Sequence, residues 1–248
     1  PKTKLIYCEG FTSQGGVRLK HADVLQEVNK VNYDGLKLEA EKLGKPMYLI
    51  PHFFDPIWEN PEAGWQELKE KVIAFKGNRK AILYVGPTEW PEKNFQVLEN
   101  AFRELGDEWS MIICGEVPAS RAKAIDPVGT RLLNLYLHHS LMQVIYPLAD
   151  IFILPSLDEP FGIATLEAMS LGLPVLLHNN AHSVWLCGDR EQCVDMRESK
   201  NIVEVLMDKD TMHKMEHEKS VGNQQHFSEN FTWEKLELDY LKLFDLDQ

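Results

Sequence analysis

The chain has few cysteines, no long apolar run and no excess of basic residues, and each absence argues against a class of protein. The cysteines are Cys8, Cys114, Cys187 and Cys193, without a CxxC pair, which argues against a disulfide or zinc framework and indicates reduced thiols. No stretch approaches the roughly 20 apolar residues of a membrane-spanning helix. The formal net charge of −12 argues against a broad surface for nucleic acid or anionic membranes.

What the composition favours is a cytoplasmic α/β protein. Peripheral attachment at the inner face of a membrane, through a partner, stays open as an alternative. A chain of 248 residues is enough for one full domain and part of a second. The sequence leaves open whether the chain is a complete protein or a fragment.

The segment 150–175 is the most informative part of the chain. Ile151–Leu154 is a short apolar run that Pro155 ends, and a helix is predicted from near Gly162 to Gly172. Another apolar run follows. This order predicts one βαβ step of a parallel sheet.

Two carboxylates flank the start of this helix. Glu167 lies four residues after Ile163, on the stripe that Ile163 and Leu166 define as inward, so its charge needs a partner. A ribose diol is the partner we expect, because two adjacent hydroxyls can donate to both carboxylate oxygens. Glu159 lies in the preceding loop, and the amides of Gly162–Ala164 would face a phosphate between the two acids. The alternative is one capping acid and one solvated acid.

These residues form a recognisable motif. Glu159-Pro160-Phe161-Gly162, Leu166–Met169 and Gly172–Val175 resemble the E-x7-E signature of retaining GT-B glycosyltransferases of the family-4 type. The resemblance implies a doubly wound, Rossmann-like parallel sheet that binds a nucleotide sugar, the carboxyl-terminal domain of that fold. It also implies that Glu159 contacts hydroxyls of the donor sugar and that Glu167 holds the ribose. Phe161, Gly162 and Ile163 would line the same site.

A second segment fits the same family. Ala81–Gly86 is a predicted buried strand, and the loop after Gly86 resembles the family loop in which an Arg and a Lys grip the pyrophosphate. Lys93 matches that Lys, so a catalytic role is implied for it; the alternative is a solvated side chain. Pro87 stands where the Arg would be, which removes a bidentate phosphate clamp and puts activity or donor choice in doubt.

Three further residues are candidates for nucleotide contacts. Gly115 follows the predicted strand Ser110–Cys114 and either approaches the nucleotide or only lets the chain turn. His138 and His139 lie in a predicted strand, 134–139, near the turn where the family places its base contacts; the alternative is that both are surface residues.

The family's Gly-Gly pair after the predicted strand Val175–His178 is absent. Asn179-Asn180 stand there instead, so the backbone cannot approach a ligand in the same way. Asn180 or His182 would then supply a side-chain contact in place of a backbone contact.

We predict three parts. Residues 1–55 form a partial or reduced amino-terminal segment on the acceptor side, 56–230 the donor-binding domain, and 231–248 a helix that packs back toward the amino-terminal part. The first part either resembles the end of the family's first domain, with elements around 22–24, 42–44 and 48–55, or is a shrunken domain with Lys4–Cys8 as its first strand and Ser13–Val17 as a glycine-rich loop. The stretch 55–64 has the composition of a linker.

The implied function is transfer of a sugar from a nucleotide sugar to an acceptor hydroxyl with retention of configuration. The nucleoside diphosphate sugar is then a substrate, and neither a cofactor nor a metal is expected. The acceptor, the base and the sugar stay open. A homodimer or a partner subunit that supplies the part of the active site expected from a first domain also stays open. No nucleic acid is expected as a partner. A non-catalytic nucleotide-sugar-binding or scaffold module is the main alternative, and a sugar-nucleotide epimerase, which would yield an isomerised donor, is the second.

Overall fold

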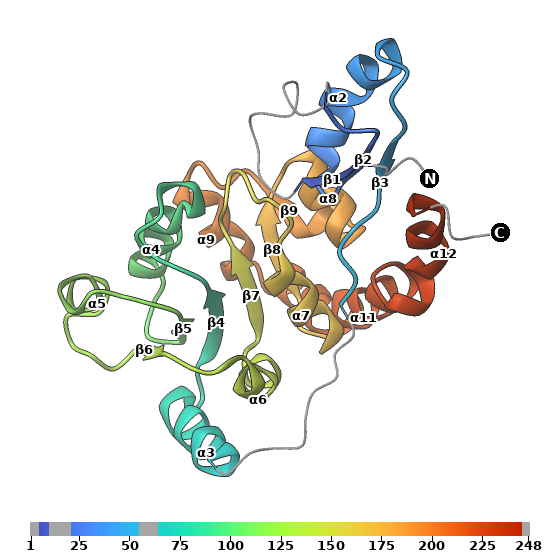
Figure 1. The fold of residues 1–248 in the computed structure, drawn as a ribbon. Coiled ribbons are helices and arrows are strands. Elements are labelled where there is room, and N and C mark those ends of the chain that lie inside the picture. Colours follow the sequence, from blue (N-terminus) through green and yellow to red (C-terminus); the bar gives the residue numbers. More distant parts are fainter. Residues whose placement is uncertain (1–4, 10–20, 55–63, 245–248) are drawn as a thin grey trace.

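Two parallel sheets organise the chain. The structure is a computed structural model that describes residues 5–9, 21–54 and 64–244. A six-stranded sheet has the order β6-β5-β4-β7-β8-β9, and a three-stranded sheet has the order β1-β2-β3 (Figure 1). Helices flank the larger sheet on both faces, which confirms the predicted α/β class with a doubly wound parallel sheet.

The elements of the larger sheet alternate along the chain. The strands are β4 Lys80–Val85, β5 Trp109–Cys114, β6 Leu132–Leu135, β7 Ile151–Leu154, β8 Val175–His178 and β9 Cys193–Val194. The helices are α3 Trp65–Lys76, η1 Pro91–Lys93, α4 Phe95–Glu104, α5 Ala119–Ile125, η2 His139–Leu141, α6 Met142–Ile145, η3 Tyr146–Leu148, α7 Ile163–Ser170, α8 Ala181–Cys187, η4 Arg190–Gln192, α9 Ser199–Met207, α10 Lys209–Lys214, the π-helical turn η5 Met215–Lys219, α11 Ser220–Asn230 and α12 Trp233–Leu243.

The strand order reverses direction between β4 and β7. From β4 the chain builds outward through β5 to β6, then returns to pair β7 with the other edge of β4. Right-handed crossovers therefore place the helices after β4 and after β7 on opposite faces of the sheet. The loops that follow these two strands start at the carboxyl edge of the sheet, where the strand order reverses, and this is the kind of switch point at which open α/β sheets bind ligands.

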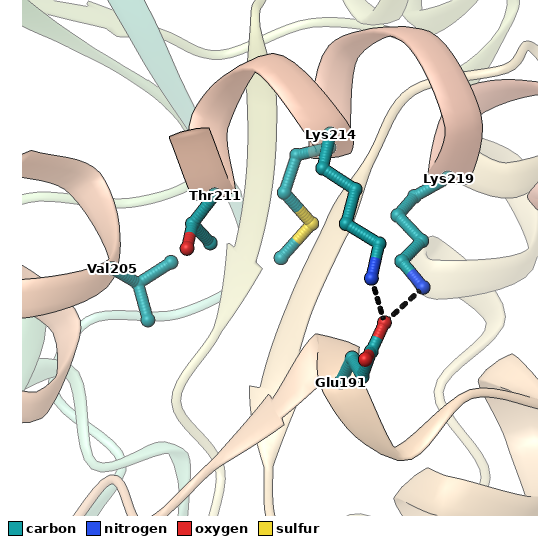
Figure 2. Close-up of a pocket in the computed structure, with 6 residues that line it drawn as sticks. Glu191, Val205, Thr211, Lys214 and Lys219 are labelled. Carbon is teal, nitrogen blue, oxygen red and sulfur yellow. Dashed lines mark hydrogen bonds and ion pairs between the residues drawn. The ribbon is translucent and has the colours of Figure 1, made fainter. Parts of the chain in front are cut away.

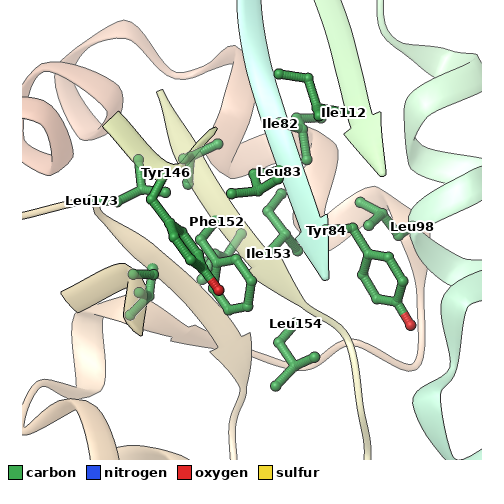
Figure 3. Packing of buried hydrophobic residues seen from close by; sticks show 14 of the residues in the cluster. Ile82, Leu83, Tyr84, Leu98, Ile112, Tyr146, Phe152, Ile153, Leu154 and Leu173 are labelled. Atoms are coloured by element: carbon green, nitrogen blue, oxygen red, sulfur yellow. The ribbon is translucent and has the colours of Figure 1, made fainter. Parts of the chain in front are cut away.

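Apolar strands and one aromatic helix face build the core. All four residues of β7 are buried, and Phe95, Leu98 and Phe102 of α4 are buried at the helical spacing that the sequence predicts. Figure 3 shows Tyr146 beside Phe152 of β7, with ring centroids 6.2 Å apart. Tyr146 thus enters the core from the segment before β7, and its hydroxyl becomes important for the site.

Two local expectations are wrong. The strand expected at 134–139 is β6, Leu132–Leu135, and the chain has left the sheet before His138, whose ring nitrogen accepts from the Ser140 N–H and opens a 3₁₀ turn. Ile163 was expected on the buried stripe of its helix, but the residue is 49% exposed, whereas Leu166 is fully buried. At the first helical residue the neighbouring turn that would cover Ile163 does not yet exist.

The smaller sheet has a helix on each face. Its strands are β1 Ile6–Glu9, β2 Val24–Glu27 and β3 Met47–Leu49, and α2 covers Lys30–Lys42. Leu25 and Ala40 pack on the α2 side, whereas Val24 and Ile50 pack against Leu243 of α12. The expected glycine-rich loop Ser13–Val17 and nearly all of the expected linker lie outside the described residues.

Within the described part of the chain, none of the helices combines the length and the apolar character needed to cross a membrane.

Candidate functional site

An ion pair joins the two loops at the reversal of strand order. Lys93 Nζ, from the loop after β4, lies 2.8 Å from Glu159 Oε2, from the loop after β7. The two side chains are only 16% and 13% exposed, so the ion pair is largely buried at this switch point. Sequence reasoning named both residues, and the structure brings them together across 66 residues of chain.

Glu167 is buried in α7 and held by two side chains. Only 5% of the residue is exposed. The Tyr146 hydroxyl donates to Oε2 at 2.6 Å, and His139 Nε2 lies 2.9 Å from Oε1. Burial and the charge of Glu167 raise the pKa of Tyr146 well above its ordinary value, so the phenol stays protonated and donates. His139 therefore does reach the site, through the carboxylate, whereas the His138 ring pairs with Ser140, at 3.0 Å from its hydroxyl oxygen.

The amino end of α7 lies between these acids in sequence. Gly162 has a φ of +94°, a left-handed conformation that a residue with a Cβ rarely adopts, and it gives α7 no side-chain cap. Among the described residues no acceptor contacts the N–H groups of Ile163 and Ala164. A helix start with free amides favours a negative charge, such as a phosphate.

The strand ends of β4 and β5 meet at two glycines. The Gly86 N–H donates to Cys114 O at 3.0 Å, and a Cβ added at Gly115 would overlap the carbonyl group of Gly86. Gly115 is therefore required by close approach of two backbones, which supports the structural alternative for this residue. Tyr84 is buried, and its hydroxyl donates to Pro87 O at 2.7 Å.

Replacement of Gly115 by alanine is expected to destabilise the protein by about 2 kcal/mol or more, as overpacking against backbone usually does. The overlap involves the rigid Gly86 carbonyl rather than a flexible side chain, so it cannot relax cheaply. Urea unfolding would measure the change. Gly222→Ala is the matched control, since nothing lies near the corresponding Cβ position there, and equal stability of the two variants would contradict the close-approach argument.

A guanidinium that sequence reasoning missed lies beside the loop after β4. Arg121 of α5 donates from Nη1 to Thr88 O at 2.8 Å and to Glu89 Oε1 at 2.7 Å. Its Nε donates to the buried Glu99 at 2.9 Å. A cation thus accompanies this loop although Pro87 replaces the expected Arg, but two carboxylates already neutralise it. Local sequence patterns could not predict this contact, because Arg121 is 33 residues away from Thr88 in the chain.

The residues expected to replace the missing Gly-Gly pair have structural partners. Asn180 caps α8 by accepting from the Ser183 N–H at 2.8 Å. His182 is buried: its Nδ1 accepts from the Lys30 N–H at 3.2 Å, and its Nε2 lies 2.9 Å from Phe161 O. Because a carbonyl can only accept, Nε2 carries the proton and the ring is neutral. Phe161 is buried too and packs edge-on against His52, with centroids 5.0 Å apart.

Stability is expected to fall as the pH drops below about 6.5. Burial lowers the pKa of His182 from 6.5, so the unfolded chain binds this proton at a higher pH than the folded chain does. Stability therefore rises with pH through the window between the two values, and it is complete above 6.5. A protonated Nδ1 would also face the Lys30 N–H. Urea midpoints between pH 5.5 and 7.5 measure this, and His182→Gln should flatten the slope; an unchanged slope would contradict the assignment.

A cavity of about 340 Å³ lies away from this switch point, between α9, α10, η4 and η5 (Figure 2). The π-helical turn places Lys214 and Lys219 on one side, and both donate to Glu191 Oε2, at 2.7 and 2.6 Å. The two lysines lower the pKa of Glu191 to about 2. Both cations are thus already paired. Nowhere in the described ranges do three His, Cys, Asp or Glu side chains form a group that could hold a metal ion.

The doubly wound sheet, with two acids and a lysine at its switch point, has the architecture of a GT-B carboxyl-terminal domain. The family profile described as Glycosyl transferases group 1 matches residues 66–215, and the chain belongs to this family.

Relatives with curated names are similar over a limited part of their length. Glycogen synthase 2 of Methylococcus capsulatus is 21% identical over 222 residues, which span 86% of this chain and 40% of the relative. Alpha-D-kanosaminyltransferase of Streptomyces kanamyceticus is 28% identical over 151 residues, 58% of this chain and 38% of the relative. The chain thus spans about two fifths of the length of these relatives.

Solved structures share the fold at low identity. Sucrose-phosphate synthase from Thermosynechococcus elongatus gives a TM-score of 0.76 at 18% identity, over 93% of this chain and 60% of that one. HepE of Anabaena, solved in complex with UDP-glucose, gives a TM-score of 0.78 at 14% identity, over 98% and 72%. These likenesses confirm the expected GT-B fold.

Proposed function

We propose that the chain binds a nucleoside diphosphate sugar and takes part in transferring the sugar to an acceptor hydroxyl with retention of configuration. The grouping of Lys93, Glu159 and Glu167 around the start of α7 carries this proposal. Membership in a glycosyltransferase family supports the reaction class. HepE, which shares the fold, binds UDP-glucose, and this supports the donor class.

Glu167 is the residue that we assign to the ribose. A carboxylate has about four lone-pair positions, so the contacts with Tyr146 and His139 leave acceptor positions for a vicinal diol. The same two contacts fix the carboxylate in one orientation. The ribose therefore meets a preorganised acceptor.

The diphosphate is assigned to Lys93 and the amino end of α7. An ammonium group has three N–H donors, and the ion pair with Glu159 uses one of them. The free amides of Ile163 and Ala164 lie at the positive end of the helix dipole and can donate to phosphate oxygens. Together these groups would stabilise the charge that develops on the leaving diphosphate.

Glu159 is assigned to hydroxyls of the donor sugar. Its carboxylate would orient the sugar while the acceptor hydroxyl attacks from the face that the leaving group departs from, which gives retention. This scheme asks for no covalent intermediate on the protein and uses no metal ion.

One observation favours a rival, a module that binds the donor without transferring it. Pro87 lacks the expected guanidinium, and Arg121 nearby is paired with Glu89 and Glu99. A radiolabelled donor separates the two functions. Slow hydrolysis or transfer to an added acceptor supports the enzyme, and a bound donor that stays intact supports the module.

Calorimetric titration with UDP, GDP, ADP and their common sugar conjugates tests the proposed function. Saturable binding of one base family would support it and define the donor. A folded sample that binds none of these compounds would overturn it for this chain.

A further inference from the structure

Three consecutive carbonyl groups in the loop that carries Glu159 accept hydrogen bonds from side chains outside that loop. Asn29 Nδ2 donates to Glu159 O at 2.8 Å and to Pro160 O at 3.3 Å. His182 Nε2 donates to Phe161 O at 2.9 Å. The loop between β7 and α7 has no regular structure of its own, so its backbone path depends on such contacts.

Asn29 belongs to the smaller sheet and is 2% exposed. It is the N-cap of α2, where its Oδ1 accepts from the N–H groups of Val31 and Asn32, at 2.8 and 3.1 Å. If the amide were flipped, its NH₂ group would face two N–H groups and its oxygen would face two carbonyl oxygens. The orientation of the amide is therefore determined. One side chain therefore ties the start of α2 to the backbone of Glu159.

His182 makes a second tie between the same two parts. It accepts from the Lys30 N–H, next to Asn29, and donates to Phe161 O. The start of α2 is thus joined to the donor loop both directly, through Asn29, and through one imidazole ring.

From these contacts we infer that Asn29, assisted by His182, is a positioning residue for Glu159. The ion pair with Lys93 holds the carboxylate end of Glu159, whereas Asn29 fixes the backbone from which it projects. The smaller sheet thereby completes the donor-sugar site from a distance. This inference rests on the proposed role of Glu159, and a misplacement of about 1 Å at a reacting group can lower a rate about 100-fold.

Asn29→Ser separates positioning from helix capping. Serine keeps an N-cap acceptor, but its shorter side chain cannot reach the two carbonyl groups. We expect UDP affinity to change less than about twofold, because Glu167 and the α7 amides are untouched. The turnover of UDP-glucose should fall about tenfold, because the two hydrogen bonds that hold the backbone of Glu159 and Pro160 are lost.

A ligand-free measurement tests the same idea independently of function. Backbone hydrogen exchange of Thr165 and Leu166, whose N–H groups donate to Gly162 O at the end of this loop, should accelerate about tenfold in Asn29→Ser, because the loop loses two of its carbonyl anchors. Asn100→Ser is the control, since Asn100 is exposed on α4 and its side chain accepts a hydrogen bond from Gln96, away from this loop. Asn29→Asp, which caps helices well but turns an oxygen toward both carbonyls, should accelerate exchange at least as much.

The outcomes separate the positioning role of Asn29 from the proposed function of the chain. Faster exchange in both Asn29 variants, with a cooperative unfolding transition retained, supports positioning even if the wild-type chain binds no UDP; in that case only the proposed function fails. Exchange of Thr165 and Leu166 that matches wild type in Asn29→Asp overturns the inference. So would a loss of UDP affinity as large as the loss of turnover, because it would indicate general damage to the site.

Discussion

Replacement of Lys93 by alanine is expected to lower the rate of sugar transfer about 100-fold. The ammonium group is assigned to the departing diphosphate, and removal of one preorganised donor of this kind costs about 10²–10³ in rate in enzymes that stabilise a developing oxyanion. The variant also leaves Glu159, only 13% exposed, without its ion-pair partner. That carboxylate would lose its fixed direction toward the sugar.

Turnover of the donor identified by titration measures this effect. Lys123→Ala is the matched control, because Lys123 is exposed on α5. Lys93→Arg keeps a cation with a different shape and should recover part of the rate. A Lys93→Ala variant that transfers sugar at the wild-type rate would exclude Lys93 from the reaction and leave the ion pair with Glu159 as a purely structural contact.

Local patterns predicted the elements that form the site. The apolar run Ile151–Leu154 and the closing Gly172 give β7 and α7 almost at the expected bounds, since short buried strands and helix ends depend on nearby residues. The E-x7-E spacing likewise placed Glu159 before the helix and Glu167 within it. These predictions needed only sequence neighbours and the 3.6-residue period.

Local patterns could not predict which side chains contact Glu167 and the loop of Glu159. Asn29 meets the Glu159 loop across 130 residues, and Tyr146 meets Glu167 across 21, in both cases through the packing of separate elements. In the sequence Tyr146 looks like an ordinary core residue, because its ring is apolar and nothing nearby in the chain indicates that its hydroxyl donates to Glu167. His139 was named for the base and instead contacts the acid that we assign to the ribose.

Replacement of Glu167 by alanine should lower nucleotide affinity at least about 100-fold. Each charge-assisted hydrogen bond to the ribose diol is worth about 1.5–3 kcal/mol, and two of them amount to a factor of about 100 or more. The variant should also unfold more easily by about 1–3 kcal/mol, because the buried Tyr146 hydroxyl loses its acceptor. Calorimetric titration and urea unfolding on the same preparation measure both quantities.

Tyr146→Phe separates the ribose contact from the internal contact of Glu167. Phenylalanine removes the donor at 2.6 Å but keeps the ring against Phe152 and leaves the carboxylate in place. If Glu167 binds the ribose, Tyr146→Phe should retain most of the affinity that Glu167→Ala loses, with a reduction below about tenfold that reflects one orienting bond. Equal losses in the two variants would mean that Glu167 acts by holding Tyr146, and a folded Glu167→Ala variant with unchanged affinity would reject the ribose assignment.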